Sequence, residues 1–416
     1  MSIFKGEKLL ILGGNILSCD IVKTAQSMGV YTIVTDWNTP EKSPAKLIAD
    51  EYWNISLTDY DQISERIKKN DIKGIVTGFT DSYLLPYQHL CELNGLYCYG
   101  TKEQFERTLD KATFKSICIE NGVDVVPQYN VEMFDKNIIS EQNKIIIKPV
   151  DNSGSRGICL CCRPADYEPM LEYALSFSQK KEVILERYME CDDVSFEYKI
   201  QDGEVLLSSI CDRYIHKTKS GGSVTSKLIY PSKFLYEYTR EVDNKVKKMF
   251  QNMGLQNGVL FMQAFVEEGH FYFYEMGFRL SGGRHYIFTE NQNGTNAVKE
   301  LICFALKGKM ADYKLANKVS PKFKNVCCQL SVLCKSDKIA KINGIPTISK
   351  MPEVIDATFY YKVGDVIGKD GTTAQIVSRI HIVAQNQLQI NDVIKKIRQT
   401  LSVMNEKGEN IIIDFL

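Results

Sequence analysis

The first hundred residues alternate short, continuous apolar runs with amphipathic segments. The apolar runs, which we expect to form strands, cover 8–14, 31–36 and 74–81. The amphipathic segments, which we expect to form helices, cover 18–28, 63–69 and 82–94. Strands that alternate with helices pair in parallel, because each helix returns the chain to the same edge of the sheet. The pattern therefore predicts a doubly wound, half-Rossmann parallel sheet in residues 1–100.

A second unit follows over residues 101–190. Within it we expect a helix that runs through residues 110–114, a hairpin around Lys148 and a strand over 183–188. The hairpin is indicated by two apolar runs that flank a loop rich in glycine and serine.

The rest of the chain reads as sheet with few helices. Residues 191–310 predict a mainly antiparallel sheet with helices at 237–252 and 296–306. The tail, 311–416, alternates short strands with turns such as VGDVIGKDGTT and ends in an expected helix over 391–405. Because the linkers are short, the domains should pack together, and we predict an α/β multidomain protein with a small β-rich C-terminal module.

The composition and charge of the chain indicate which kinds of partner and cell compartment to expect. The 416 residues are 44% hydrophobic and 25% charged, which is typical of a globular protein. Lys and Arg number 51 and so do Asp and Glu, so no overall basic field attracts nucleic acid or an anionic membrane. No apolar run reaches the length of a membrane span, and thirteen cysteines with no metal-site spacing favour a reducing compartment. We expect a cytoplasmic protein.

The first glycine turn bears on whether the chain binds a dinucleotide. Gly13, Gly14 and Asn15 follow the first predicted strand, but the full GxGxxG of a dinucleotide site is absent. A Rossmann-type oxidoreductase is therefore an alternative that only the first hundred residues support.

The segment KIIIKPVDNSGSRGICL, residues 144–160, carries more chemistry. Lys148 follows its apolar run, at the end of a predicted strand, and the loop over 152–157 consists mainly of small residues. Glycine lets backbone N–H groups approach phosphate oxygens closely, so this loop suits a phosphate-binding lid. A tight hairpin with a surface lysine is the alternative.

A second hairpin places two oxygen donors opposite each other. If its turn has three residues centred on Gly269, Gln263 lies directly across from Glu275 on one face. Two oxygens at cross-strand spacing can share a hard cation such as Mg²⁺.

Five elements occur in order along the chain: LDKATFK, the Lys148 hairpin, VILERYMECDDVSFE, the segment from Asp212 to Val224, and GVLFMQAFVEEGHFYFYEMGFRLSGG. Together they resemble the ATP-grasp superfamily over roughly residues 5–310. The tail resembles the C-terminal module of the biotin-carboxylase-like and amino-acid-ligase branches. The resemblance thus points to carbamoyl-phosphate-synthase and biotin-carboxylase relatives among carboxylate–amine ligases. It implies a small lid subdomain in 101–190 and a large subdomain in 191–310.

The resemblance also implies roles for individual residues. Residues expected to bind ATP are Lys111, Lys148, Ser153, Gly154, Ser155, Gly157, Glu186, Tyr188, Met189 and Glu190. Of these, Glu186 and the backbone around Tyr188 and Met189 would contact the adenine edge, and Glu190 would accept hydrogen bonds from the ribose hydroxyls. Residues expected to act on the reacting groups are Lys148, Arg213 and Arg279, of which Arg279 would reach the transferring phosphoryl group. The metal ligands would be Gln263 and Glu275, holding Mg²⁺ or Mn²⁺. The family commonly has Glu where this chain has Gln263 and Asn where it has Gly277, so we expect one metal ion through Glu275.

The resemblance implies an ATP-dependent ligase. ATP would phosphorylate a small-molecule carboxylate, and an amine would attack the acyl phosphate to form a C–N bond, giving ADP and phosphate. Family resemblance also favours a homodimer. Two alternatives remain open: a carboxylase that uses bicarbonate, and an ATP-binding protein with little turnover, which the changes at Gln263 and Gly277 favour.

Overall fold

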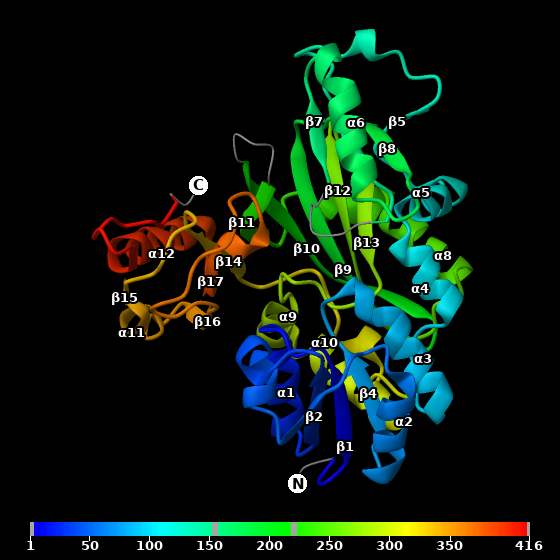
Figure 1. The fold of residues 1–416 in the computed structure, drawn as a ribbon, viewed down its shortest axis with the longest axis vertical. Coiled ribbons are helices and arrows are strands. Elements are labelled where there is room, and N and C mark those ends of the chain that lie inside the picture. Colours follow the sequence, from blue (N-terminus) through cyan, green and yellow to red (C-terminus); the bar gives the residue numbers. More distant parts are fainter. Residues whose placement is uncertain (1–3, 152–156, 218–222, 414–416) are drawn as a thin grey trace.

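The computed structural model describes residues 4–151, 157–217 and 223–413. Figure 1 shows three parts: an N-terminal part in blue at one end, a central body that ends in a small sheet, and a C-terminal module in orange and red at the side. The parts combine one parallel and several antiparallel sheets with helices, which confirms the predicted α/β multidomain fold. Among the described residues, every helix is too short or too polar to span a lipid bilayer.

The N-terminal part is a parallel sheet, as predicted, and its strand order is β3-β2-β1-β4. Its strands are β1 (Lys8–Leu12), β2 (Tyr31–Asp36), β3 (Glu51–Asn54) and β4 (Gly74–Thr77). Its helices are α1 (Ser18–Ser27), α2 (Tyr60–Lys69) and α3 (Leu84–Asn94). The edge strand β3 falls outside the predicted strands, because EYWN is too short and polar to form an apolar run.

The carboxylate of Asp36, at the end of β2, is used inside this sheet. It accepts hydrogen bonds from the Gly14 N–H (2.8 Å) and the Ser43 hydroxyl (2.6 Å). It also forms a 2.8 Å ion pair with the buried Lys46 ammonium. An acid after the second strand would bind a ribose in a dinucleotide enzyme. Here its oxygens are already paired, so the geometry favours a structural scaffold over the oxidoreductase alternative.

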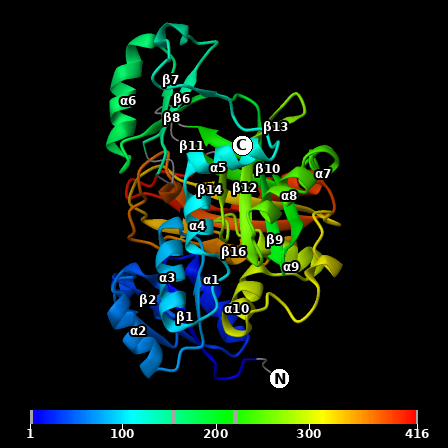
Figure 2. The same ribbon diagram turned by 90° about the vertical axis from the view of Figure 1, so that its right-hand side faces the viewer.

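A small antiparallel sheet forms the far end of the central body, and Figure 2 shows it with α6 opposite the N-terminal part. Its strands, in the order β5-β8-β6-β7, are β5 (Gln128–Tyr129), β8 (Val183–Arg187), β6 (Ile145–Pro149) and β7 (Cys159–Cys161). Helix α6 (Tyr167–Ser176) covers one face through an apolar cluster that includes Ile145, Ile147 and Leu185. Side chains alternate along a strand, so Lys148 and Glu186 point to the opposite face, toward helix α5 (Lys111–Glu120).

An eight-stranded sheet joins the central body to the C-terminal module. Its order is β13-β12-β9-β10-β11-β14-β17-β16. The strands are β9 (Asp192–Gln201), β10 (Glu204–Lys217), β11 (Ser223–Tyr230), β12 (Gly258–Glu267), β13 (His270–Gly277), β14 (Val326–Leu333), β16 (Val354–Phe359) and β17 (Ile376–Ala384). Because β11 pairs directly with β14, one continuous face is shared by both parts. The expected boundaries at 100, 190 and 310 therefore stay predictions.

The remaining elements flank these sheets. The helices are α4 (Lys102–Leu109), α7 (Leu235–Glu241), α8 (Asp243–Asn252), α9 (Tyr286–Asn293), α10 (Ala297–Lys307), α11 (Ile345–Ile348) and α12 (Gln387–Thr400). The strands β15 (Lys341–Asn343) and β18 (Ser402–Met404) pair with each other. The helix expected over 237–252 is two helices that meet at Val242.

The expected C-terminal helix over 391–405 is wrong at both ends. Helix α12 begins earlier because the Asn386 side chain caps it, accepting a hydrogen bond from the Gln389 N–H. It ends at Thr400, and the next residues turn into β18. Pairing with β15 stabilises this strand, and the chain's local pattern does not reveal that partner.

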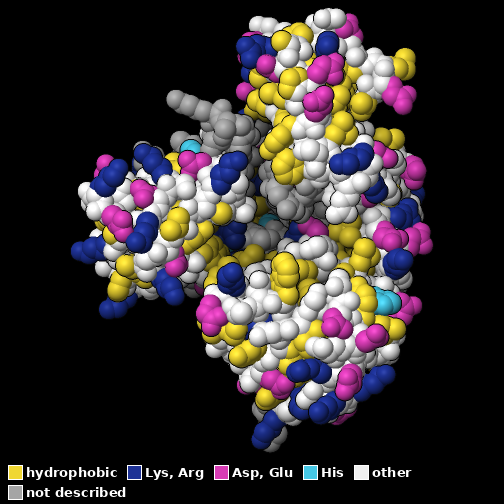
Figure 3. Space-filling model, in the orientation of Figure 1, with side chains coloured by type: hydrophobic (Ala, Val, Ile, Leu, Met, Phe, Trp, Pro, Cys, Tyr) yellow, Lys and Arg dark blue, Asp and Glu magenta, His cyan; other side chains and the backbone are white. Residues whose placement is uncertain are grey.

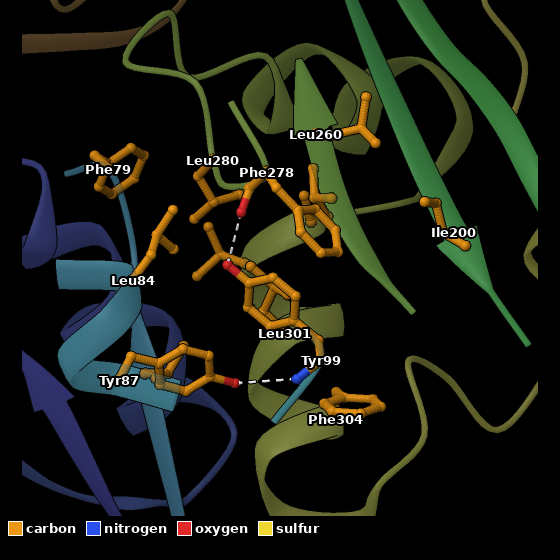
Figure 4. Packing of buried hydrophobic residues seen from close by; sticks show 14 of the residues in the cluster. Phe79, Leu84, Tyr87, Tyr99, Ile200, Leu260, Phe278, Leu280, Leu301 and Phe304 are labelled. Carbon is orange, nitrogen blue, oxygen red and sulfur yellow. Dashed lines mark hydrogen bonds between the residues drawn. The ribbon is translucent and has the colours of Figure 1, made fainter. Parts of the chain in front are cut away.

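Aromatic packing fixes the central body on the N-terminal part. Tyr99 lies between Tyr87 and Phe278, with ring centroids 5.4 Å and 5.0 Å away, respectively. Its hydroxyl donates a 2.9 Å hydrogen bond to the Phe278 carbonyl, as Figure 4 shows. Helix α10 adds Leu301 and Phe304 to the same cluster. Phe278 follows β13 directly, so this packing also fixes the segment that carries Arg279.

Strand β9 carries a buried carboxylate without a hydrogen-bond partner among the described residues. Glu197 is 1% exposed, and neither of its oxygens is hydrogen bonded. Burial raises the pKa of Glu197 to about 7, the Lys199 charge opposes this, and Glu300 adds to it. The Lys199 ammonium is already paired with Glu300 at 2.9 Å. Ionised Glu197 is therefore an uncompensated buried charge.

We expect Glu197→Gln to stabilise the protein at pH 8 but not at pH 5. A carboxyl whose pKa is raised on folding binds a proton more tightly in the folded state, so the stability that this proton gives is lost as pH rises from 4.5 to 7. Glutamine does not ionise, so the variant keeps this stability at high pH. Its free energy of unfolding should therefore exceed the wild-type value at pH 8 by up to about 3 kcal/mol. Urea unfolding at both pH values measures this, and parallel pH profiles of the two proteins would contradict it.

Candidate active site

The three parts meet around a hollow on the face shown in Figure 3, and basic side chains are visible within it. Helix α5, strand β6 and the β12–β13 hairpin contribute Lys111, Lys148 and the pair Gln263 and Glu275, respectively. The expected lid residues Ser153, Gly154 and Ser155 lie outside the described residues. Gly157 is described and has φ 78°, and a Cβ there would lie 2.7 Å from Phe177.

The hairpin brings Gln263 opposite Glu275, as predicted, but by a different route. The turn has two residues, Glu268 and Gly269, with φ of 50° and 81°, which is the geometry of a type I′ turn. This turn alone would place Tyr274 opposite Gln263. A β-bulge next to Gln263 adds one residue to the other strand and restores the pairing with Glu275. The expectation of a three-residue turn is therefore wrong, although the pairing derived from it holds.

The side-chain oxygen of Gln263 accepts a hydrogen bond from Arg213. Its Nη1 donates to Gln263 Oε1 at 3.1 Å and to both Asp193 oxygens at 2.9 Å. The same nitrogen donates to the Tyr274 hydroxyl, and Nη2 donates to Thr225 Oγ1 at 3.2 Å. Burial opposes the charge on Arg213, but Asp193 outweighs burial, so the pKa of Arg213 lies above its ordinary value. These contacts hold the Arg213 guanidinium in place, and its expected role at the reacting groups stays a prediction.

This arrangement leaves Glu275 as the better placed of the two expected metal ligands, and the metal site itself stays a prediction. A cation beside the Arg213 guanidinium is repelled, so Gln263 is a poor ligand here. Gly277 pairs with Phe261, and a Cβ at Gly277 would lie 2.4 Å from the Phe261 ring, which fills the space of a second ligand. Within the described residues, no cluster of three His, Cys, Asp or Glu side chains could hold an ion. The donors fit one Mg²⁺ that takes its other ligands from phosphate and water.

Lys111 lies within electrostatic range of both Glu275 and Lys148. Lys111 is the first residue of α5, where Asp110 caps the helix by accepting from the Thr113 N–H. Burial lowers the pKa of Lys111, the Glu275 carboxylate opposes that shift, and Lys148 adds to it. These effects place Glu275 and Lys148 around Lys111, and we call the three residues one electrostatic cluster. Such a cluster suits a polyanion.

Glu186 holds two lysines in place. Lys148 forms a 2.8 Å ion pair with one of its oxygens, and Lys115 bonds the other. Burial would raise the pKa of Glu186, but Lys148 and Lys115 outweigh burial and lower it. Burial lowers the pKa of Lys115 to about 8, with Glu186 opposing. The sequence prediction assigned Glu186 to adenine and missed Lys115, which lies one helical turn after Lys111 on the same face.

The segment after β8 reaches toward β10. The Lys217 ammonium donates to the Tyr188 hydroxyl at 2.6 Å and lies 5.0 Å from the centre of that ring. Met189 is buried, whereas Glu190 is exposed with its carboxylate 4.0 Å from Lys144. The adenine and ribose roles of this segment stay predictions.

Arg279 does not point freely at a phosphoryl position. Its Nε and Nη2 donate to the two oxygens of Asp81, at 2.6 Å and 2.7 Å. Its guanidinium lies 5.0 Å from the centre of the Phe261 ring. Asp81 follows β4 in the N-terminal part, so the pattern of the hairpin could not reveal this partner. In this structure the Arg279 guanidinium forms a bidentate pair with Asp81, and its expected contact with the phosphoryl group stays a prediction.

His285 is buried and neutral. Burial, with smaller effects from Arg213 and His381, lowers its pKa to about 3. Its Nδ1 is within hydrogen-bond distance of the Ser209 and Tyr230 hydroxyls, at 3.2 Å and 3.1 Å. Such a group does not accept a proton near neutral pH, so the geometry favours a structural role.

Comparison with known proteins gives one match to a domain family and several similar proteins. Residues 141–285 match the ATP-grasp domain family. The chain is 23% identical over 290 residues to a formate-dependent phosphoribosylglycinamide formyltransferase of Mycolicibacterium gilvum, a match that covers 65% of this chain and 69% of that protein. The L-amino acid ligase of Bacillus licheniformis has a similar structure, with a TM-score of 0.79, 15% identity and coverage of 97% and 99%. The biotin carboxylase domain of Hydrogenobacter thermophilus 2-oxoglutarate carboxylase is also similar in structure, with a TM-score of 0.77 and 19% identity. That match covers 95% of this chain and 90% of the other.

Proposed function

Because residues 141–285 form an ATP-grasp domain, we propose that this chain is an ATP-dependent ligase. In the proposed reaction a substrate carboxylate oxygen attacks the γ-phosphorus of ATP, and the bond to the β-phosphate oxygen breaks to give an acyl phosphate and ADP. An amine then attacks the acyl carbon, and phosphate leaves as the C–N bond forms. The similarity of the chain to the ligases compared above supports this chemistry.

The observation that carries the proposal is the cluster of Lys111, Lys148 and Glu275, brought together from three separate elements. The two ammonium groups oppose each other's charge, and a triphosphate between them would relieve this repulsion. Glu275 supplies the one carboxylate that a phosphate-bound cation needs.

ATP and Mg²⁺ are the expected cofactors, and Mn²⁺ can use the same oxygen ligands. A bound cation would neutralise charge on the phosphates, with Glu275 as its protein ligand. Lys111 and Lys148 would hold the phosphates, and Glu186 positions Lys148 through its 2.8 Å ion pair. We place Arg213 behind the site, where it fixes Gln263 and shares its charge with Asp193.

Two alternatives make different predictions. A carboxylase would use bicarbonate, and the similar carboxylase domain was solved with MgADP and bicarbonate. An ATP-binding protein with little turnover is favoured by the contacts of Gln263 with Arg213 and of Phe261 with Gly277. Cytoplasmic location and a homodimer are parts of the proposal that rest on sequence alone.

The test is release of ADP and phosphate from Mg-ATP with a mixed panel of carboxylates, amines, amino acids and bicarbonate. We expect release that requires a carboxylate and an amine together. Release with bicarbonate and one acceptor would favour the carboxylase. Thermal stabilisation by ATP without substrate-dependent release would contradict the ligase and favour the binding protein.

A further inference from the structure

The chain folds back along helix α3 before it enters the central body. Gly95 ends the helix with φ 62°, and the N–H of the residue after it donates to the Cys91 carbonyl at 2.9 Å. A glycine cap of this kind turns the chain sharply without backbone strain. Further on, the Tyr99 N–H donates to the Tyr87 hydroxyl at 3.4 Å, as Figure 4 shows. These two contacts hold Cys98 against the helix, beside Cys91.

A hydrogen bond joins the thiols of Cys91 and Cys98. The Tyr87 hydroxyl is hydrogen bonded to both sulfurs and so fixes the pair from one side. Cys91 is 0% exposed, whereas Cys98 is partly exposed. Two thiols in contact, one of them open to solvent, form the arrangement that a reversible disulfide needs.

The two thiols differ in how readily they ionise. The hydrogen bond with Cys91 lowers the pKa of Cys98, although burial opposes this shift. Burial, together with the neighbouring Cys98, holds the pKa of Cys91 well above its ordinary value. A thiolate attacks an oxidant far more readily than a thiol does. Cys98 is therefore the thiol that reacts first, and Cys91 is placed to attack its oxidised sulfur.

From this geometry we propose that Cys91 and Cys98 form a reversible redox pair, which a peroxide closes to a disulfide. The Cys98 thiolate attacks one oxygen of hydrogen peroxide, the O–O bond breaks, and the leaving hydroxide takes up a proton to give water. Cys98 is thereby oxidised to a sulfenic acid. The Cys91 sulfur then attacks the Cys98 sulfur, the S–O bond breaks, and the Cys91 proton leaves with the hydroxide as a second water. Exchange with a dithiol reductant, which becomes a disulfide itself, restores both thiols.

Oxidation of this pair would act on the joint between the N-terminal part and the central body. Tyr99, next to Cys98, donates from its hydroxyl to the Phe278 carbonyl at 2.9 Å. The segment is closely packed, because a Cβ at Gly100 would lie 2.7 Å from the nearest aromatic ring. A disulfide brings two sulfurs closer than a hydrogen bond does. Closing it should therefore shift Tyr99 and loosen its contact with the segment that carries Arg279.

Peptide mapping of the full chain tests the pair without turnover. Tryptic cleavage after Lys73 and Lys102 gives one peptide that contains Cys91 and Cys98 and no other cysteine. The wild type is treated with hydrogen peroxide, the remaining thiols are blocked with iodoacetamide, and the mass of this peptide is measured. We expect a peptide that carries no block and is lighter than the reduced peptide by two hydrogen atoms. Treatment with dithiothreitol before blocking should give a peptide blocked at both cysteines.

Cys191 is the matched control, because it is also partly exposed but burial raises its pKa to about 11. At low peroxide it should be oxidised at least about tenfold less than the pair. In Cys91→Ser, Cys98 should stop at the sulfenic acid, which dimedone traps, and in Cys98→Ser the buried Cys91 should stay reduced. Circular dichroism confirms that each variant is folded. A treated wild-type peptide that is still blocked at both cysteines, or oxidation no greater than at Cys191, would overturn the pair.

The effect on turnover is a separate measurement, and it alone rests on the proposed ligase function. Substrate-dependent ADP release should fall in the oxidised wild type and return with dithiothreitol, whereas Cys98→Ser should be insensitive to peroxide. Unchanged release in fully oxidised wild type, or an equal loss in Cys98→Ser, would overturn the link from the pair to the active site. An untreated wild type that releases no ADP counts against the ligase proposal instead, and the peptide mapping still decides the redox pair.

Discussion

Glu275→Gln should lower substrate-dependent ADP release by about 10²–10³-fold, which is typical of losing one preorganised charged group at a reacting phosphate. The substitution keeps the shape of the side chain and removes its charge. Glu275 is the remaining carboxylate in the cluster, because Gln263 faces Arg213 and the Phe261 ring occupies the place beside Gly277. Within the described residues, no group of three His, Cys, Asp or Glu side chains is placed to hold an ion in its stead.

A binding measurement distinguishes the loss of the metal ligand from misfolding of the variant. Thermal stabilisation by ATP should depend on Mg²⁺ in the wild type and much less in Glu275→Gln. Glu267→Gln is the matched control, because Glu267 lies on the same hairpin but pairs with Arg187 at 2.5 Å. Near-wild-type turnover and an unchanged Mg²⁺ requirement in Glu275→Gln would remove Glu275 from the metal site.

Local patterns in the sequence predicted the parallel sheet, the Lys148 hairpin and the antiparallel sheet. Each depends on the periodicity of neighbouring residues, which the chain shows directly. The pairing of Gln263 with Glu275 was predicted as well, because the bulge in β13 offsets the shorter turn. A prediction that relied on the turn alone would have placed Tyr274 there.

The partners of the site residues could not be predicted in the same way. Asp81 holds Arg279 across 198 positions of sequence. This contact leaves no local pattern, since it depends on how complete domains pack. Lys115 is the exception, because its spacing from Lys111 on one helix face was visible in the sequence.

Arg284 joins all three parts of the molecule. It follows the hairpin segment, is 3% exposed and has φ 55°. Its Nε donates to Asp20 on α1 at 2.7 Å, and its Nη1 donates to Asp356 on β16 at 2.7 Å and to Thr358 at 3.0 Å. One guanidinium therefore links the N-terminal part and the C-terminal module to the segment between them.

Arg284→Met should lower the free energy of unfolding by about 3–5 kcal/mol, because it leaves two acids beside a buried site without their cation. Methionine keeps most of the volume, so the loss reports charge rather than a cavity. Arg163→Met is the matched control: Arg163 also donates to two oxygens of one aspartate, Asp166, at 2.8 Å and 2.9 Å, but its side chain is 73% exposed. Its loss should cost under about 1 kcal/mol. Urea unfolding followed by circular dichroism measures both variants. Equal effects would mean that burial does not set the strength of the Arg284 link, and that the C-terminal module is held by its sheet pairing alone.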